Sequence, residues 1–152
     1  PGLTMERPEI VKRLMDGVRY KKTGIMLDTG HLMHTNPKLK TPDEAVDYIL
    51  TILDRYEDTS FIRGIHLHQS LTGSKAAEFM QNWKRIEGTY PQQMWDVMTH
   101  IFQIDTHRPF CSYRINEIFS RLSGLEFVCL EQITATREEN DTYLTEQMKY
   151  LA

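Results

Sequence analysis

The chain has 152 residues, 40% of them hydrophobic, and no apolar run approaches the ~18 residues that a membrane-spanning helix needs. Its 18 lysines and arginines against 21 aspartates and glutamates give a formal charge of -3, which supplies no general attraction to nucleic acid or to an anionic membrane. Length and composition predict about one globular domain. The two cysteines form no disulfide framework, so we expect reduced thiols and a cytoplasmic location.

The hydrophobic pattern along the chain alternates between helix and strand periods. Apolar side chains at three-to-four spacing predict amphipathic helices, and short apolar runs predict strands. Thr41 and Glu44 form a capping-box pattern around Pro42, which marks the start of a helix. In chain order the expected elements are helix, strand, helix, strand, three helices, strand and helix, at residues 8–21, 24–28, 41–56, 61–68, 76–83, 94–101, 113–122, 125–130 and 136–150.

This order predicts a parallel α/β fold. Strands that are separated by helices run parallel when they are neighbours in one sheet, so their carboxyl ends meet at one edge. Functional residues of α/β proteins gather at that edge. Residues 71–104 are expected to add helices beside it, and Trp83 and Trp95 fit helix faces that we expect in the core.

Each predicted strand ends in a side chain that could bind a metal ion. Asp28 ends the first strand with His31 three residues later, His66 and His68 lie at the end of the second strand, and Glu131 follows the third. The two histidines of the second strand point the same way, because strand side chains alternate with a period of two. Carboxylates and imidazoles are common ligands of divalent ions. The three strand ends therefore predict one set of metal ligands.

A second set is predicted between the second and third strands. Asp105 and His107 stand one residue apart in the segment QIDTHRPF, and with His31 they offer a carboxylate and two imidazoles. Each candidate ligand has an ordinary explanation when taken singly, such as the capping of a turn. Their coincidence at three consecutive strand ends favours a site. His34 and His100 lack this placement, and we expect them to be surface or packing residues.

These motifs resemble those of the xylose isomerase-like TIM-barrel superfamily, which contains sugar isomerases, sugar epimerases and endonuclease IV-type apurinic-site nucleases. The resemblance covers nearly the whole chain and rests on the motifs LDTGH, GIHLHQS, IDTH and CLEQ at residues 27–31, 64–70, 104–107 and 129–132. It implies that the strands are the sixth, seventh and eighth of a (β/α)8 barrel. Residues 1–152 would then form the C-terminal part of a TIM-barrel domain, with a helical insertion at 71–104.

The resemblance also implies roles for individual residues. Three positions match metal ligands common to the superfamily: Asp28, His66 and Glu131. In the isomerases and epimerases, the histidine that matches His31 contacts the substrate. In the nucleases, that histidine holds an additional zinc ion together with the residues that match Asp105 and His107.

The chain departs from the family pattern at several positions. His68-Gln69 stands where relatives often carry Asn-Asp or Lys-Asp, so we expect His68 to support the ligands from behind or to replace His66. Residues 71–103 are longer than the matching loop of the nucleases. The fifth-strand glutamate of the family would fall just before Pro1, and a closed barrel needs about 250 residues.

We therefore expect a partial barrel whose metal set is incomplete, so that the chain alone binds metal weakly or not at all and is inactive. Its unpaired strand edges would lead to self-association, unless a separate N-terminal half of the barrel covers them. The inward face of the sheet, which such a partner would cover, is expected to carry four residues: Met26, Ile62, Phe127 and Cys129.

Three functions are consistent with these residues, and the first is slightly favoured. It is a metal-dependent sugar or sugar-phosphate isomerase or epimerase, in which a zinc, manganese or magnesium ion polarises a carbonyl, Glu131 moves a proton and His31 contacts the sugar. The second is an endonuclease IV-type zinc phosphodiesterase that cleaves abasic DNA, which the second ligand set favours and the acidic balance opposes. The third is a barrel-derived binding module without catalysis, marked by the loss of metal binding.

Overall fold

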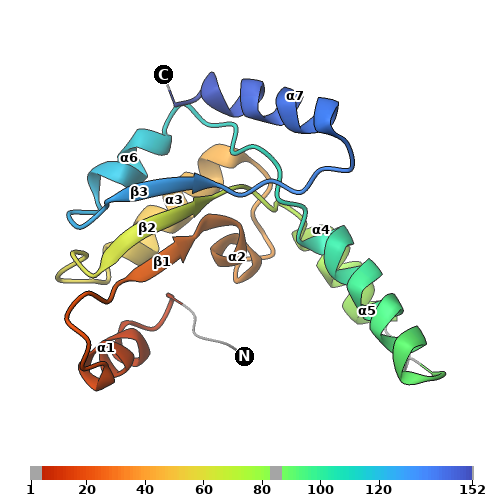
Figure 1. The fold of residues 1–152 in the computed structure, drawn as a ribbon, viewed down its shortest axis with the longest axis horizontal. Coiled ribbons are helices and arrows are strands. Elements are labelled where there is room, and N and C mark those ends of the chain that lie inside the picture. Colours follow the sequence, from red (N-terminus) through yellow and green to blue (C-terminus); the bar gives the residue numbers. More distant parts are fainter. Residues whose placement is uncertain (1–4, 83–86, 152) are drawn as a thin grey trace.

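Three parallel strands form one small sheet in this computed structural model, which describes residues 5–82 and 87–151. Strands β1 (Ile25–Asp28), β2 (Ile62–Leu67) and β3 (Phe127–Leu130) lie side by side in that order, and both pairs are parallel. Helices separate the strands in the sequence, and such crossover connections make neighbouring strands run in the same direction. The predicted parallel α/β fold is confirmed at this level, as an open three-stranded sheet with helices (Figure 1).

Every predicted helix is present, with ends that differ by a few residues. The structure adds one helix, α2, which is six residues long and too short to show a hydrophobic period. In chain order the helices are α1 (Pro8–Gly17), α2 (Thr29–His34), α3 (Pro42–Leu53), α4 (Gly73–Asn82), α5 (Tyr90–Ile104), α6 (Ile115–Ser120) and α7 (Arg137–Met148). Among the described residues, none of these helices combines the length and the apolar character that crossing a membrane requires.

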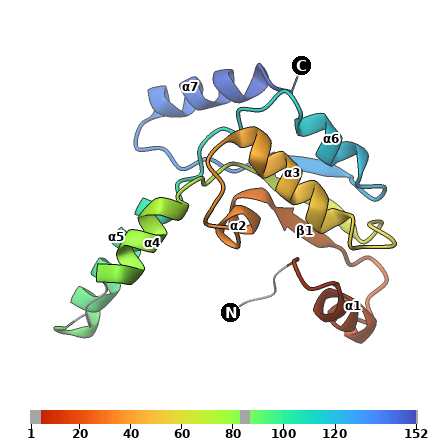
Figure 2. The same ribbon diagram turned by 180° about the vertical axis from the view of Figure 1, so that it is seen from behind.

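The core lies between the sheet and the helices α3 and α6, which cover one of its faces (Figures 1 and 2). Leu27 of β1 and Ile65 of β2 are fully buried there, together with Ile49 of α3 and Ile118 of α6. This layer packs directly behind β1 and β2, which pair as far as Asp28 and His66 near their carboxyl ends.

The opposite face of the sheet is open in the part of the chain that the structure describes. Met26 and Phe127 are 38% and 49% exposed and flank Gly64, where an added Cβ would lie 2.6 Å from the Phe127 ring. Cys129 is also exposed, as expected for this face. The expectation for Ile62 is wrong, because this side chain is fully buried in the core. A register shift between Ile25 and Met26 changes the alternation at the start of the β1–β2 pair.

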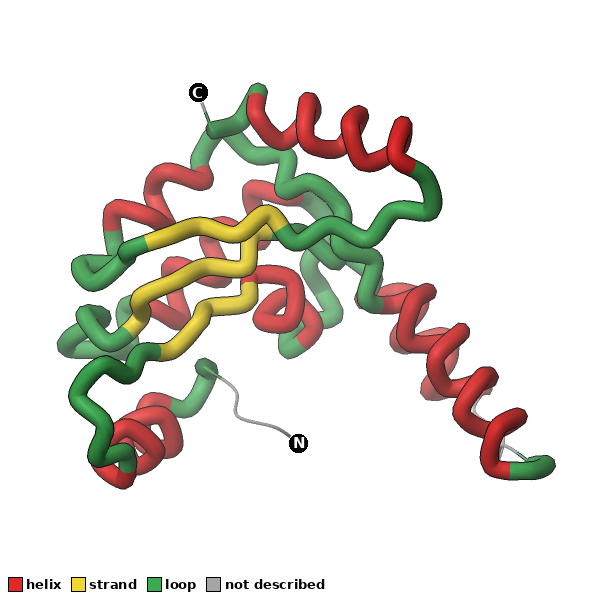
Figure 3. The backbone as a smooth tube through the Cα atoms, viewed as in Figure 1, coloured by secondary structure: helices red, strands yellow, loops and turns green. Residues whose placement is uncertain are grey.

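Helices α4 and α5 extend away from the sheet as a pair (Figures 1 and 3). Neither helix contains a buried residue among those described. The expectation that Trp95 belongs to the core is wrong, because its side chain is 74% exposed. Trp83 lies outside the described residues. His100 stacks on Phe79, with ring centroids 3.2 Å apart, so its predicted packing role is confirmed.

Candidate metal centre

Five of the six histidines of the chain gather with three carboxylates at the carboxyl ends of the strands. The sheet edge supplies some of these side chains, and α2 and the loop after α5 supply the others. The complete set is Asp28, His31, His34, His66, His68, Asp105, His107 and Glu131.

The first group of side chains joins the ends of all three strands. Asp28 is the last residue of β1, His66 pairs with it in the sheet register, and Glu131 directly follows β3. His66 Nδ1 lies 3.7 Å from Asp28 Oδ2 and 2.8 Å from Glu131 Oε2. One ligand atom of each residue lies within 4.8 Å of the other two. The predicted convergence of these residues is confirmed.

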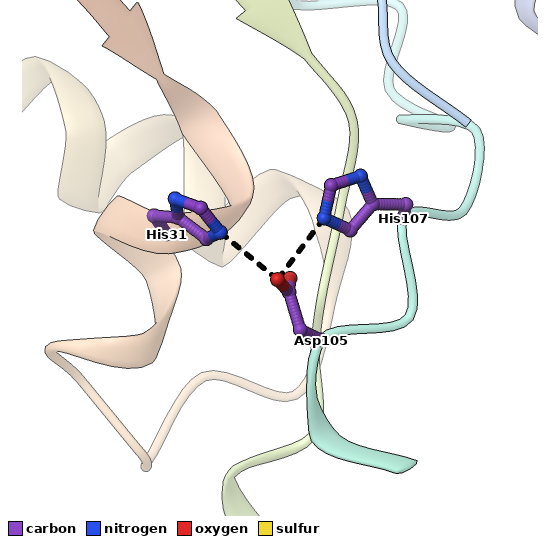
Figure 4. A group of neighbouring side chains, drawn as sticks. All are labelled: His31, Asp105 and His107. Carbon is purple, nitrogen blue, oxygen red and sulfur yellow. Dashed lines mark hydrogen bonds and ion pairs between the residues drawn. The ribbon is translucent and has the colours of Figure 1, made fainter. Parts of the chain in front are cut away.

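The second group joins α2 to the loop after α5, as Figure 4 shows. Asp105 Oδ2 lies between two imidazole rings, 2.9 Å from His31 Nε2 and 3.0 Å from His107 Nε2. The other ring nitrogen of His31, Nδ1, lies 3.1 Å from Asp28 Oδ2. The prediction that Asp105 and His107 approach His31 is therefore confirmed, and His31 connects the two groups.

His68 lies behind both groups and is completely buried. Its Nε2 is 2.9 Å from Asp28 Oδ1, and its ring stacks on the His107 ring with centroids 3.8 Å apart. His68 thus supports Asp28 from behind, which was one of the two roles expected for it. It also forms a third set with His107 and Glu131, in which one atom of each lies within 4.8 Å of the others.

Hydrogen bonds hold the segments that carry these groups against each other. The hydroxyl of Thr29, buried at the start of α2, donates to the His68 carbonyl over 2.6 Å and accepts from the His68 N–H over 3.1 Å. Gln69 and Arg108 exchange two backbone hydrogen bonds of 2.8 and 3.0 Å. These bonds fix α2 and the loop after α5 beside the end of β2.

Ser70 orders the turn that carries the second group. Its side chain is almost fully buried, and its hydroxyl donates to Asp105 Oδ1 over 3.3 Å. The same oxygen accepts from the backbone N–H groups of Thr106 and His107 over 3.1 and 3.4 Å. His107 has a φ of 44°, a left-handed conformation that residues other than glycine rarely adopt. The bonds to Ser70 help to hold the backbone in that conformation.

Three groups of donor atoms lie close enough together that each could hold a divalent ion. The distances of 2.9 and 3.0 Å around Asp105 are in the range of hydrogen bonds, whereas ligand atoms ~2.1 Å from one tetrahedral ion would lie roughly 3.4 Å apart. The buried atoms His68 Nδ1, His107 Nδ1 and Glu131 Oε2 have no hydrogen-bond partner among the described residues. Although Glu131 Oε2 lies 2.8 Å from His66 Nδ1, the two are not aligned for a hydrogen bond. Unpaired buried atoms are costly, and an ion between His107 Nδ1 and Glu131 Oε2, which lie 3.9 Å apart, would satisfy these two. His68 Nδ1 lies against Gly30 and has no room for an ion.

The charged groups of the site stabilise one another. Burial acts to raise the pKa of Asp28, but hydrogen bonds from the His68 ring and from the His31 backbone outweigh it and lower the pKa to about 2. Burial likewise acts to raise the pKa of Asp105, and hydrogen bonds from His31 and His107 lower it overall. Both carboxylates are therefore ionised at neutral pH, the form that binds cations.

The pKa values of two histidines at the rim of the site are shifted in opposite directions. Burial acts to lower the pKa of His31, but the carboxylates of Asp105, Asp28 and Glu131 raise it overall. Burial lowers the pKa of His34, and this effect exceeds the attraction of Asp105. The neutral form of His34, which this shift favours, has one ring nitrogen without a proton.

Sequence reasoning did not place two residues beside the site. His34, expected to be a surface or packing residue, is partly buried with its Nε2 3.9 Å from Asp105 Oδ1, and it belongs to none of the three candidate ligand groups. The i, i+3 spacing of His31 and His34 on one helix face was the available signal, but α2 itself was not predicted. The bonds of Ser70 to Asp105 depend on a contact between residues 35 positions apart.

Comparisons of the chain with family models, with curated proteins and with solved structures found no match. The function proposed for the chain therefore rests on the fold and on the geometry of the site.

Proposed function

We propose that the chain carries a metal centre for two or more ions and that this centre belongs to a hydrolase of phosphate esters. The observation that carries the proposal is the meeting of Asp105 and His107 with His31, directly beside the group formed by Asp28, His66 and Glu131. Clusters of divalent ions in one site are typical of enzymes that cleave phosphate esters. Histidine-rich ligand sets favour zinc.

We also propose an assignment of the fold to a larger barrel. The three strands and their helices would be consecutive units of a (β/α)8 barrel of the xylose isomerase-like superfamily. In support of this, the candidate ligands lie at the carboxyl ends of parallel strands, where barrel enzymes place their active sites. The pair α4–α5 would be an insertion after the seventh barrel strand.

The residues of the chain have separable tasks in the proposed site. Asp28, His66 and Glu131 would hold one ion, and His31, Asp105 and His107 would hold another. Bound ions would supply a water nucleophile at neutral pH and stabilise the charge that develops on a phosphate.

The carboxylate of Asp28 is oriented for this task by its neighbours. Its Oδ1 accepts hydrogen bonds from the His31 backbone and from His68, which leaves Oδ2 facing His31 Nδ1 at 3.1 Å and His66 Nδ1 at 3.7 Å. Glu131 Oε2 has no hydrogen-bond partner among the described residues and is free to bind a cation or to accept a proton.

A sugar or sugar-phosphate isomerase or epimerase is the second candidate. The first group alone is sufficient for the single ion that this reaction needs, with Glu131 moving the proton and His31 contacting the sugar. The charge of -3 is the observation that favours it, because binding of abasic DNA requires contacts to phosphates. Arg108, beside the second group, is already paired with Glu139 at 3.6 Å.

Titration of the purified chain with zinc and with manganese separates these candidates. We expect at least two equivalents of zinc to bind, with one lost in His107→Ala and another in His66→Ala. His100→Ala is the matched control, because His100 packs on Phe79 between α4 and α5 and should leave the stoichiometry unchanged. A single equivalent of metal that still binds in Asp105→Ala would favour the isomerase. If no metal binds at all, the non-catalytic binding module is the function that remains.

The metal-loaded chain should then be assayed on three substrates: bis(p-nitrophenyl) phosphate, a duplex with one abasic site, and a panel of ketose and aldose sugars. Cleavage of either phosphate diester that is lost in both His107→Ala and His66→Ala supports the hydrolase. Interconversion of sugars without cleavage of the diesters contradicts it.

A further inference from the structure

One side of α5 is apolar and, among the residues that the structure describes, uncovered along most of its length. We call this surface the α5 stripe, and it consists of Met94, Trp95, Met98, Ile101 and Phe102. These side chains are 41%, 74%, 37%, 40% and 52% exposed in that order. Their spacing of three and four residues places them next to each other on one helix face. An amphipathic helix normally buries such a face.

Helix α4 packs on a different side of α5 and leaves the stripe free. The contact between the two helices includes the stacking of Phe79 on His100. His100 and Met98 are two residues apart, so they lie about 200° apart around the helix. At the base of the pair, the Thr72 hydroxyl donates to the Ile104 carbonyl over 2.6 Å. Figures 1 and 2 show α5 pointing away from the sheet, with α4 as the one described helix alongside it.

The charge distribution of α5 suits contact with an identical surface. Asp96 is the only aspartate, glutamate, lysine or arginine between Tyr90 and Ile104. It lies about 160° around the helix from the middle of the stripe at Met98, among glutamine and threonine residues. Two stripes can therefore meet without burying a charged side chain and without like charges facing each other.

We propose that the α5 stripe is the contact surface of a homodimer, in which α5 helices from two copies of this chain pack antiparallel about a two-fold axis at Met98. In this arrangement Met98 meets Met98 of the other copy, because a two-fold contact uses the same patch on both copies. Met94 then faces Phe102, and Trp95 faces Ile101. A larger side chain opposes a smaller one in the second pair, and the flexible methionines fill the gaps between rings.

The size of the surface agrees with this arrangement. Side chains of this kind present on the order of 150–250 Å² each when fully exposed. At the observed exposures, the stripe offers roughly 500 Å², and Tyr90, 73% exposed in the first turn of α5, brings it to roughly 650 Å². Two such surfaces would bury roughly 1,300 Å² in total, within the range of about 1,200–2,000 Å² that stable interfaces bury.

Tryptophan fluorescence of the 152-residue chain can test the location of the contact as well as its existence. The chain has two tryptophans, so Trp83→Phe leaves Trp95 as the only one. We expect this variant to be a dimer by analytical ultracentrifugation at micromolar concentration. Its emission should shift to shorter wavelength as concentration rises, because Trp95 moves from water into the interface. Both effects should titrate with the same midpoint.

Met98→Glu in the same background places two like charges at the proposed axis. We expect it to weaken dimerisation on the order of 100-fold or more and to abolish the wavelength shift. Met148→Glu is the matched control, because Met148 is an exposed methionine of α7, far from α5 in the sequence, and should leave the dimer intact. Circular dichroism of both variants checks that they are folded.

Three results would overturn the proposal. A chain that stays monomeric at all concentrations would mean that another protein or a further chain segment covers the stripe. A dimer whose Trp95 emission does not change with concentration would be held by another surface, such as the edges of the sheet. Equal weakening by Met98→Glu and Met148→Glu would also exclude a specific contact at α5.

Discussion

Gly30 lies directly against the His68 ring, and only a glycine fits there. A Cβ at this position would lie 2.1 Å from Cε1 and 2.3 Å from Nδ1 of the ring. The ring has no free space to move into, because it is completely buried, bonded to Asp28 and stacked on His107. The glycine of the LDTGH motif is therefore part of the support of the candidate metal centre.

We expect Gly30→Ala to lower the free energy of unfolding by about 1–3 kcal/mol, because the added methyl group overpacks a rigid site. It should also weaken zinc binding, since a displaced His68 no longer orients Asp28. Urea unfolding and zinc titration measure the two effects. Gly17→Ala is the control, because an added Cβ at the end of α1 meets nothing within 4 Å. Equal unfolding midpoints for the two variants would show that the ring is not held as described.

At the scale of the element, α3 supplies a large part of the core and its first turn is capped by its own sequence. Its buried residues are Ala45, Val46, Ile49, Ile52 and Leu53. The Thr41 hydroxyl accepts from the Glu44 N–H over 3.2 Å, and Glu44 Oε2 accepts from the Thr41 N–H over 3.3 Å. The capping box predicted from the sequence is confirmed.

Thr41→Ala should therefore lower the free energy of unfolding by about 1 kcal/mol, the usual cost of removing an N-cap hydroxyl. Thr51→Ala on the same helix is the comparison. The exposed Thr51 hydroxyl only donates to the Asp47 carbonyl one turn earlier, and its loss should be neutral or slightly stabilising. Both are measured by urea unfolding monitored by circular dichroism. If Thr51→Ala were the more costly change, the cap would not be what stabilises the start of α3.

At the scale of the whole molecule, the candidate metal centre joins the ends of β1, β2 and β3. Asp28, His66 and Glu131 come from the three strands, so an ion held by them would tie the sheet together at its carboxyl edge. Their ligand atoms come together only in the folded chain. Binding energy at such a site therefore adds to the stability of the fold.

We expect zinc at about 100 times its dissociation constant to stabilise the fold by ~2.7 kcal/mol, through binding to the folded form alone. The melting temperature should rise on addition of zinc and return to its starting value with a chelator. His66→Ala should lose most of this rise, whereas His100→Ala should keep it. Zinc that binds in titrations but leaves the melting temperature unchanged would show that its site is not formed by folding.

The sequence alone was sufficient to predict every element except α2, as well as the parallel arrangement of the strands, because the underlying signals are local. Hydrophobic period, capping residues and turn residues act within a few positions of one another, as at Thr41 and Glu44. The alternation of strands and helices then requires the carboxyl ends to share an edge. For that reason the sequence is enough to place Asp28, His66 and Glu131 together.

Only the tertiary structure decided which further atoms complete the site and which apolar surfaces stay open. The short helix α2 brings His34 to Asp105, and the buried hydroxyl of Ser70 holds the turn at His107. The exposure of α5 was also decided by the tertiary structure. Its apolar residues predicted a core helix, but they lie exposed, and Trp95 is the most exposed of the stripe at 74%. An amphipathic pattern indicates that a face requires a partner, but the identity of that partner depends on how distant segments pack.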